Sequence, residues 1–173
     1  NGMAPEGGKG WASLALLMRT SGDNGLTWTP PQAIDPRMIG RHQVISDTLM
    51  TKDGVLIQNC DAVHGGSRGK SWVDPGEGKP APVFTEGGTG EGIIAGIHAK
   101  VIELEDGRLL AFGRSDSIDG KMPMSISSDL GKTWSTPTVP EGISQPVARL
   151  HLRRLASGRL LIVKHGETID TNH

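Results

Sequence analysis

The sequence predicts an all-β protein built from repeated antiparallel units, and three observations support that fold class. An eight-residue motif recurs along the chain, apolar runs alternate with Asp-Gly or Ser-Gly corners, and the 173 residues include 25 glycines and 11 prolines. Apolar, β-prone runs on both sides of such a corner are typical of β-hairpins. We therefore expect hairpins joined by tight turns, with every strand pair antiparallel.

The recurring motif reads SGDNGLTW at residues 21–28 and SSDLGKTW at residues 127–134. A third copy, GGSRGKSW at residues 65–72, has Ser67 in place of the aspartate. The aspartate can accept hydrogen bonds from N–H groups of a tight turn, the glycine at the fifth motif position permits a positive φ, and the tryptophan packs. Each copy therefore predicts a hairpin corner. The motif residues expected to be structural are Asp23, Trp28, Trp72, Asp129 and Trp134.

A second periodic signal interleaves with this motif. Apolar runs flank Asp53-Gly54, Asp106-Gly107 and Ser157-Gly158, which are expected to be two-residue hairpin corners. The three glycines are separated by 53 and 51 residues, and the motif tryptophans by 44 and 62, with a mean of 53. One unit of about fifty residues thus holds two hairpins, which is typical of a four-stranded propeller blade.

These units divide the single expected domain into successive blades. The expected segments are a half-blade at residues 1–40, a short blade at 41–75, a loop at 76–92, a full blade at 93–140 and a half-blade at 141–173. Strands a, b, c and d of the full blade, counted outward from the axis, are expected at residues 96–105, 108–114, 122–128 and 133–139. The first half-blade is expected to supply only strands c and d, and the last only a and b.

The middle unit is shorter than the others. From Gly54 to Trp72 is 18 residues, whereas from Gly107 to Trp134 is 27. The missing length is about that of one strand and a turn, so this blade is either truncated or has lost a strand. Residues 76–92 are rich in proline and glycine and are expected to form an excursion rather than a strand.

The eight-residue motif resembles the Asp-box, S-x-D-x-G-x-S/T-W, of sialidases and other β-propellers. The resemblance implies that the chain is about three blades of a six-bladed sialidase-like propeller with antiparallel four-stranded blades. It also implies that substrate binds on the face of the d-to-a and b-to-c connections, which we call the funnel face, away from the Asp-boxes. Half-blades at both ends would expose strand edges, so a homo-oligomer that completes the propeller is a further expectation.

Three side chains of the expected funnel face stand out. His98 lies in an apolar run at the start of a strand, where an ionisable side chain is unusual. Arg114 directly follows the next strand, and Asp116 comes two residues later. This pair suits either an anion clamp with an orienting carboxylate or a structural ion pair.

Further cations are expected around the same funnel. Arg149 and His151 share one face of a strand, because side chains alternate along a strand. Arg41 and His42 begin the corresponding strand of the middle unit. Together these residues predict a cationic ring that binds substrate.

A cationic funnel suits carboxylated sugars. The resemblance implies a sialidase-like glycoside hydrolase, in which arginines bind the sugar carboxylate, an aspartate is the acid/base and a tyrosine is the nucleophile. Arg114 and Arg149 match the arginines, and Asp116 or Asp119 matches the acid/base. The chain contains no tyrosine and no Arg-Ile-Pro motif, so it does not complete this mechanism alone. Relatives of this fold that cleave uronic-acid polysaccharides make His98 a further catalytic candidate.

Two functions therefore stay open. One is a hydrolase, or a fragment of one, that acts on acidic glycans, with a polysaccharide-lyase-like activity as a variant. The other is a non-catalytic Asp-box module that binds glycan or protein. The arginine and histidine content favours the enzyme, whereas the absence of tyrosine and the short middle blade favour the module.

Composition argues against several other classes of partner. The formal net charge of −1 and the lack of a basic stripe argue against nucleic acid. No apolar run approaches the roughly 18 residues that span a bilayer. No metal or other cofactor is expected, because the spacing of Asp61, His64 and His98 matches no ligand pattern. An extracellular or periplasmic location is expected, although the chain starts without a signal-peptide pattern.

Overall fold

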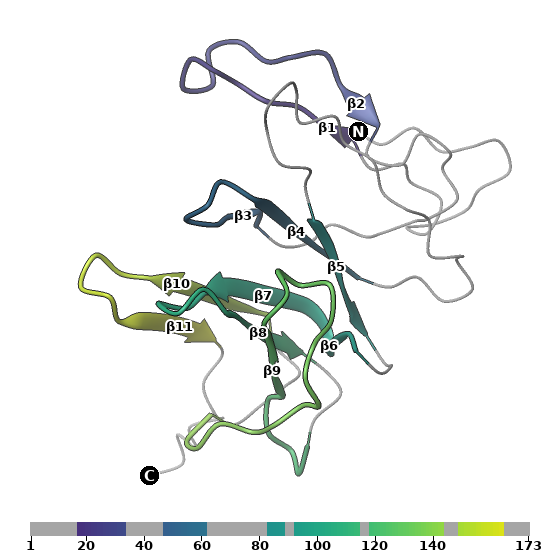
Figure 1. The fold of residues 1–173 in the computed structure, drawn as a ribbon, viewed down its shortest axis with the longest axis vertical. Helices are drawn as coiled ribbons and strands as arrows, with labels where there is room; N and C mark the ends of the chain where they lie inside the picture. The colour runs from purple at the N-terminus through teal and green to yellow at the C-terminus, as the bar shows by residue number, and fades with distance from the viewer. Residues whose placement is uncertain are drawn as a thin grey trace, which may run out of the picture.

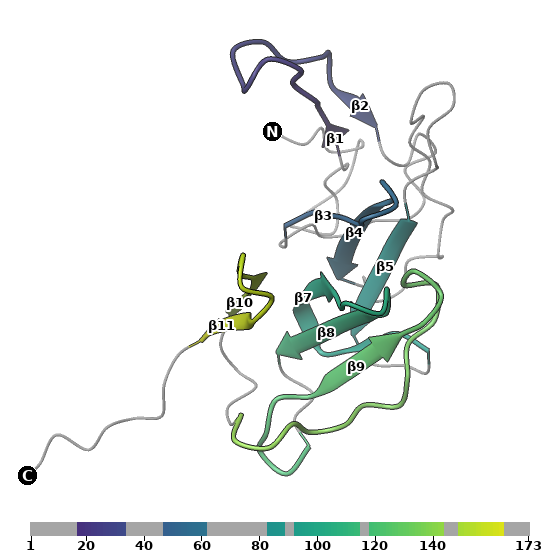
Figure 2. The same ribbon diagram turned by 60° about the vertical axis from the view of Figure 1, so that its left-hand side comes forward.

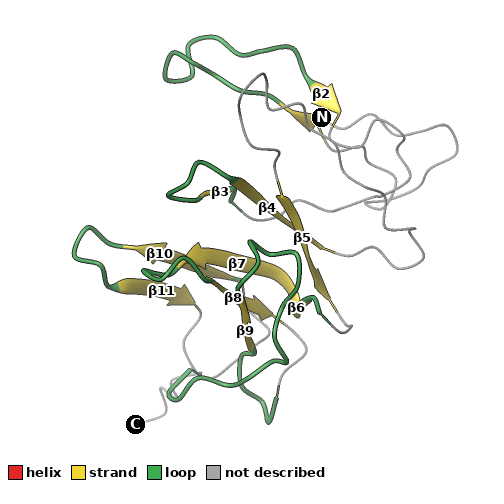
Figure 3. Cartoon of the chain, in the orientation of Figure 1, coloured by secondary structure: helices red, strands yellow, loops and turns green. Residues whose placement is uncertain are grey.

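The computed structural model describes residues 17–33, 47–61, 83–88, 92–114, 118–143 and 149–164. Within them the protein contains strands and turns but no helix, as Figure 3 shows. The all-β fold class is therefore confirmed, and small antiparallel sheets of two and three strands are consistent with partial propeller blades. These residues accordingly include no helix with the length and apolarity that a membrane crossing requires.

Most of the described strands are short, and Figure 1 labels each of them. They are β1 (Leu17–Met18), β2 (Gln32–Ala33), β3 (Leu49–Met50), β4 (Leu56–Asp61), β5 (Val83–Gly88), β6 (Ile94–Ala95), β7 (Ile97–Glu103), β8 (Leu109–Arg114), β9 (Met124–Ser127), β10 (Leu150–Arg154) and β11 (Leu160–Lys164).

The best-formed blade is the antiparallel sheet β7-β8-β9, whose strands correspond to a, b and c of the expected full blade. β10 and β11 form the inner hairpin of the next blade, and β1 and β2 form a separate two-stranded sheet. The fourth strand expected at residues 133–139 is reduced to one bridge between Met124 and Thr138. β7 packs against both β4 and β10, so it lies between the hairpins of its two neighbours (Figures 1 and 2).

The remaining sheet, β3-β4-β5-β6, corrects two expectations. β5 lies inside residues 76–92, which were expected to form a loop, and the β4–β5 and β5–β6 pairs are parallel rather than antiparallel. The edge of β4 offers N–H and C=O groups that need partners, and the β-prone run at residues 83–85 supplies them. The β4–β5 pair can be parallel because the 21 residues 62–82 separate the two strands, which is long enough for a parallel crossover.

The three predicted a–b corners are hairpin turns, but their loops contain three residues rather than two. At the first corner the Thr51 N–H donates to the Val55 carbonyl (2.9 Å), and the Gly54 N–H donates to the Thr51 carbonyl (3.0 Å). The same two bonds recur at the other two corners. Only the glycine has a positive φ, 79° at Gly54 and 83° at both Gly107 and Gly158. Each corner is therefore a type I turn followed by a left-handed glycine.

Two apolar clusters lie between successive blades. The first joins the β3–β4 hairpin to the β7-β8-β9 sheet, and its buried members are Val55, Ile57, Ile94, Ala99, Leu109, Ala111 and Trp134. The second joins that sheet to the β10–β11 hairpin, and its buried members are Ile102, Leu110, Phe112, Met122 and Leu150. Because side chains alternate, consecutive residues of β8 enter different clusters. The central blade is thus covered on both faces.

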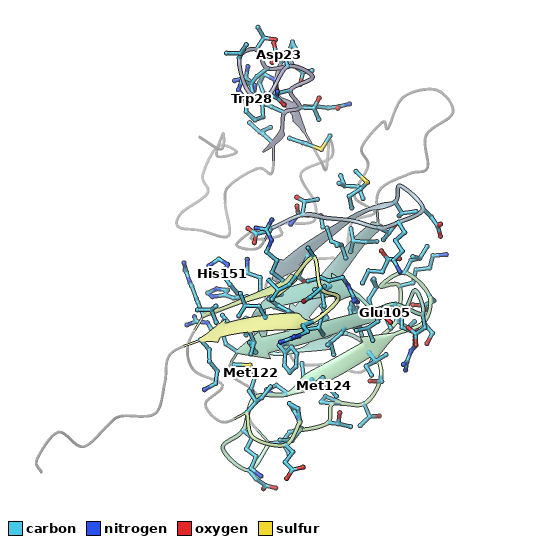
Figure 4. All side chains as sticks on the ribbon, turned by 90° about the vertical axis from the view of Figure 1, so that its left-hand side faces the viewer. Asp23, Trp28, Glu105, Met122, Met124 and His151 are labelled. Atoms are coloured by element: carbon cyan, nitrogen blue, oxygen red, sulfur yellow. The ribbon has the colours of Figure 1, made fainter. Side chains whose placement is uncertain are left out.

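Hydrogen bonds also join the three a–b corners to one another. The Lys52 N–H donates to Glu103 Oε2 (2.8 Å), and Lys52 Nζ donates to the Glu105 carbonyl (3.1 Å). From the other side, Arg154 Nη2 donates to the Glu103 carbonyl (2.7 Å). Figure 4 shows Glu105 on this side of the blades and His151 toward the opposite side. These charge-assisted bonds fix the spacing of the blades at the corner face.

Replacing Gly107 with alanine should destabilise the protein through backbone strain alone. The φ of Gly107 is 83°, and a Cβ added there would meet no heavy atom within 4 Å. We expect urea denaturation to show a free energy of unfolding lower by about 1–2 kcal/mol, the cost of a left-handed L-residue.

Gly22→Ala is the matched control, because its added Cβ also meets nothing within 4 Å and its φ is not positive. Equal losses in Gly107→Ala and Gly22→Ala would contradict the turn assignment.

Candidate functional site

The two complete Asp-boxes form the same hydrogen-bond network. Ser127 Oγ donates to Asp129 Oδ1 (2.8 Å) and accepts from the Gly131 N–H (2.8 Å). Asp129 Oδ1 accepts from the Thr133 N–H (2.9 Å), and Oδ2 accepts from the Thr133 hydroxyl (2.6 Å). The first copy repeats these bonds with Ser21, Asp23, Gly25 and Thr27.

These bonds favour the charged form of both carboxylates. The side-chain hydrogen bond from Thr133 is the largest cause that lowers the pKa of Asp129 from 3.8 to about 2. The bond from Thr27 does the same for Asp23, whose pKa also falls to about 2. Carboxylates held in this way stabilise a turn rather than exchange protons near neutral pH.

The tryptophans of the Asp-boxes differ in their surroundings. Trp134 is buried in the first apolar cluster, between two blades. Trp28 is 54% exposed, and its Nε1–H donates to the Gly25 carbonyl (3.1 Å), so the packing expected for it is not formed among the described residues. Trp72 lies outside them.

The second Asp-box and the candidate site lie at opposite ends of the β7-β8-β9 sheet. Ser127 of the Asp-box pairs with Leu109, at the start of β8. Arg114, at the end of β8, pairs with Ile97. Arg114 lies five positions after Leu109 along β8, which corresponds to roughly 17 Å of extended strand. The register therefore separates the stabilising turn from the funnel face.

His98 lies in a β-bulge. Ile97 pairs with Arg114 and Lys100 with Phe112, so His98 and its neighbour stand opposite a single residue of β8. The φ of His98 is 52°, in the left-handed region that non-glycine residues seldom adopt. A bulge re-aims a side chain, and such backbone conformations persist where the surrounding structure holds them.

Three neighbours hold this bulge in place. A Cβ on Gly96 would clash with the carbonyl of Arg114, and one on Gly113 would clash with the carbonyl of Ala95, so two glycines permit the close approach of the chains. Asn59 Nδ2, on β4 of the neighbouring blade, donates to the Ala99 carbonyl (2.6 Å). Asn59 is therefore a positioning residue for His98.

The charges of two predicted arginines act on the imidazole of His98 at this end of the sheet. His98 is buried, and burial is the largest cause that lowers its pKa from 6.5 to about 4. The charges of Arg114 and Arg149 lower the pKa of His98 further. Arg114, at the end of β8, and Arg149, directly before β10, therefore lie near enough to His98 on β7 for their charges to act on its imidazole.

A second polar cluster lies where the three inner strands meet. Asp47, Lys100 and His151 each stand seven residues before a corner glycine, and so occupy the same place in three successive blades. Lys100 Nζ lies 2.9 Å from Asp47 Oδ2, and His151 Nδ1 lies 4.0 Å from the same oxygen. The hydrogen bond from Lys100 is the largest cause that lowers the pKa of Asp47. The equal offset from the corners is the sequence signal that would have identified Asp47 and Lys100.

A family model for the BNR repeat-like domain matches residues 3–170. The chain belongs to the BNR repeat-like family. This family is found in sialidase-like propellers, and the resemblance predicted from the Asp-boxes is confirmed. No curated protein sequence matches this BNR repeat-like chain.

The other predicted site residues of this BNR repeat-like chain are less informative. Asp119 (φ 51°) and Gly120 (φ 72°) form an exposed two-residue turn between Ile118 and Lys121, closed by bonds of 3.2 and 2.9 Å. This is a type I′ turn, in which Asp-Gly is favoured, and its role as an acid/base stays a prediction. Like Trp72, the predicted residues Arg41, His42 and Asp116 fall outside the described part of the chain. Within the described part, no group of three His, Cys, Asp or Glu side chains is placed to hold a metal ion.

Replacing Asp129 with alanine should destabilise the protein in a pH-dependent way. The pKa of Asp129 is about 2 in the folded protein and 3.8 as the ordinary value, so its contribution is present above pH 4 and is lost as pH falls toward 2. At pH 7 we expect the free energy of unfolding to fall by about 1–2 kcal/mol, because the turn N–H groups lose their acceptor.

Denaturation at several pH values measures both effects, and Asp53→Ala, on an exposed a–b corner, is the matched control. At pH 2 the two variants should differ little from the parent protein. A loss of stability in Asp129→Ala that is equally large at pH 2 and pH 7 would refute the carboxylate's role.

Proposed function

We propose that this BNR repeat-like protein binds carboxylated sugars on its funnel face through Arg114 and Arg149. The observation that carries the proposal is that both guanidinium charges act on the buried His98, which lowers its pKa. Two guanidinium cations near the same imidazole repel each other, and an anion bound beside them relieves that repulsion. The planar guanidinium binds a carboxylate through two parallel hydrogen bonds, which gives geometric specificity.

His98 complements the two arginines. Because its pKa is about 4, its imidazole is neutral at pH 7 and offers one hydrogen-bond donor and one acceptor. A sugar hydroxyl is a suitable partner for such a group, because a hydroxyl can both donate and accept a hydrogen bond. The combination therefore fits a sugar that carries both a carboxylate and hydroxyl groups.

Cleavage of the bound acidic glycan is the finer part of the proposal. A sialidase-like hydrolysis needs an acid/base, for which Asp116 and Asp119 are the candidates. It also needs a nucleophile, and because the sequence contains no tyrosine, a residue of another type would have to take that role. The neutral His98 beside two arginines favours a lyase-like elimination as the second candidate. In that reaction His98 accepts the proton α to the carboxylate, and the arginines stabilise the negative charge. The C–O bond to the leaving sugar then breaks to give an unsaturated product, the leaving oxygen takes a proton from water, and the proton on His98 returns to solvent.

Product analysis with a sialoside and with a polyuronate separates these activities. Release of free sialic acid supports hydrolysis, and an unsaturated, ultraviolet-absorbing uronate supports elimination. Binding of either sugar without any product supports a non-catalytic module.

Arg114→Ala should weaken the binding of an acidic sugar by about 1.5–3 kcal/mol, the range for a hydrogen bond to a charged group. Arg114→Lys should restore only part of the affinity, because a point charge lacks the guanidinium fork. Titration calorimetry with an acidic sugar and its neutral parent measures both effects.

Arg108→Ala is the matched control, because Arg108 is an exposed arginine that pairs with Asp106 at the corner face (2.7 Å). Equal weakening of the acidic and the neutral sugar, or an equal effect of Arg108→Ala, would contradict the proposed site.

Binding of the acidic sugar should take up a proton at His98. In the free protein burial and the two arginines hold the pKa of His98 at about 4, and a bound carboxylate offsets the arginine contribution and raises this pKa toward 6.5. Because the bound form holds the proton more tightly, the affinity should increase as pH falls from 7 toward 4.

Titration of the His98 imidazole by NMR, with and without the sugar, measures the two pKa values directly. His98→Asn should remove the pH dependence of the affinity. Equal pKa values in the free and bound protein would argue against a carboxylate beside His98.

A further inference from the structure

We propose that Asp47, held in place by Lys100, is a second ligand-binding group, which accepts a hydrogen bond from a sugar hydroxyl in the central channel of the propeller. This role rests on the proposed function, because the sugar bound by the two arginines is the ligand that would reach Asp47. Recognition of a hydroxyl beside recognition of the carboxylate assigns to the ligand a sugar ring rather than a simple carboxylic acid.

The repeat places Asp47 one layer further into the channel than the arginine site. His98 and Arg149 each stand nine residues before the glycine of their a–b corner, and we call them the upper layer. The lower layer stands seven residues before the same glycines and consists of Asp47, Lys100 and His151. Along β10, where the pairing has no bulge, two residues correspond to roughly 7 Å. This separation is comparable with the width of one sugar ring.

The side chains of the lower layer converge from three successive blades. Lys100 Nζ donates to Asp47 Oδ2 (2.9 Å), and His151 Nδ1 lies 4.0 Å from the same oxygen. Asp47 comes shortly before β3 in the first of these blades, and His151 belongs to β10 in the third. Side chains of the first and third blades can meet only along the inner edge of the blade between them. The cluster therefore lies on the channel side of the inner strands.

The charges of the lower layer select a neutral hydrogen-bond donor. The hydrogen bond from Lys100 is the largest cause that keeps the pKa of Asp47 below its ordinary value, so at neutral pH the carboxylate is ionised and only accepts hydrogen bonds. Among the described residues, Asp47 Oδ1 has no hydrogen-bond partner, whereas Oδ2 accepts from Lys100. The ammonium group repels a cation or an amine, and the carboxylate repels an anion. A sugar hydroxyl donates without carrying a charge and meets both conditions.

The two partners of this ion pair differ in exposure, as a fixed binding group requires. The side chain of Lys100 is only 11% exposed, and that of Asp47 is 80% exposed. A largely buried lysine needs a counter-charge, so Lys100 fixes the position of the carboxylate. The rest of the carboxylate stays accessible to a ligand. An ion pair with one exposed partner contributes little to stability, which leaves binding as the better account of Asp47.

One chain of hydrogen bonds links the segment of Asp47 to the bulge of His98. Thr48 Oγ1 donates to Gln58 Oε1 (2.7 Å), and Gln58 Nε2 donates to the Asn59 carbonyl (2.8 Å). Asn59 Nδ2 then donates to the carbonyl of the residue that follows His98 (2.6 Å). Gln58 and Asn59 are 7% and 2% exposed, and buried amides are costly unless they are hydrogen-bonded. They hold the two layers at a fixed separation, which reduces the ordering cost of binding.

NMR titration of the full chain with methyl glucuronide and its neutral parent, methyl glucoside, tests the proposal. Asp47→Asn should weaken the binding of both sugars equally, by about five- to thirtyfold, because both carry the hydroxyl that loses its charged acceptor. Arg114→Ala should weaken the binding of the glucuronide alone. Asp53→Asn is the matched control, since it removes the same charge from an exposed a–b corner, and it should bind both sugars like the parent chain.

Single-deoxy analogues of methyl glucuronide test the contact itself. One analogue should bind the parent chain about five- to thirtyfold more weakly than the intact sugar, and the two should bind Asp47→Asn alike, because their common partner is gone. Asp47→Asn leaves a largely buried ammonium without a counter-charge, so Asp47→Asn/Lys100→Met, which carries neither charge, is measured beside it. The far-UV spectrum checks that each variant is folded.

The outcomes separate this role from the proposed carboxylate site. Unchanged binding of both sugars by the folded variants, or a deoxy effect as large in the variants as in the parent chain, overturns the role of Asp47. Weaker binding of both sugars in Asp47→Asn without any effect of Arg114→Ala supports the hydroxyl contact and contradicts the carboxylate site. The reverse result supports the carboxylate site and overturns the role of Asp47. A parent chain that binds neither sugar contradicts both.

Discussion

The burial of apolar side chains between successive blades is the interaction on which the rest of the structure depends. Isolated two-stranded hairpins are marginally stable in water, and most of the sheets here have two or three strands. The β7-β8-β9 sheet gains its stability from being covered on both faces by the two apolar clusters. The bonds between the corners through Glu103, and the Asp47–Lys100 pair at the inner strands, add polar contacts between the same blades.

The same packing determines the candidate site. The bulge at His98 is held from the neighbouring blade by Asn59, and the charge of Arg149, from the blade on the other side, acts on the imidazole. Stability and chemistry are thus separated along each blade. The Asp-boxes and a–b corners occupy one end of the strands, whereas the arginines and His98 occupy the other. Substitutions at Asp129 are therefore expected to change stability, and substitutions at Arg114 to change binding.

Local sequence patterns predicted the turns and hairpins of the fold, but they did not predict the pairing of strands that lie far apart in the sequence. The a–b corners and the Asp-box turns depend on four to eight consecutive residues, so their position could be predicted from the sequence. The loop length could not, because Asp-Gly forms a three-residue loop at Gly54 and a two-residue turn at Gly120, depending on the register of the flanking strands. The parallel pairing of β5 brings together segments separated by a long connection, and only the edge left by β4 favours it. His98 can be predicted from one segment, because it is an ionisable residue in an apolar run. Asp47 and Lys100 can be recognised as a cluster only when the three repeats are aligned on their corner glycines.

Nuclear Overhauser contacts between methyl groups of adjacent blades test the central claim most directly. The account predicts contacts between Ile57 on β4 and Leu109 or Ala111 on β8, because these residues enter one buried cluster from two blades. It equally predicts contacts between Leu110 on β8 and Leu150 or Leu152 on β10. Contacts confined to residues of the same hairpin, with none between blades, would contradict the account.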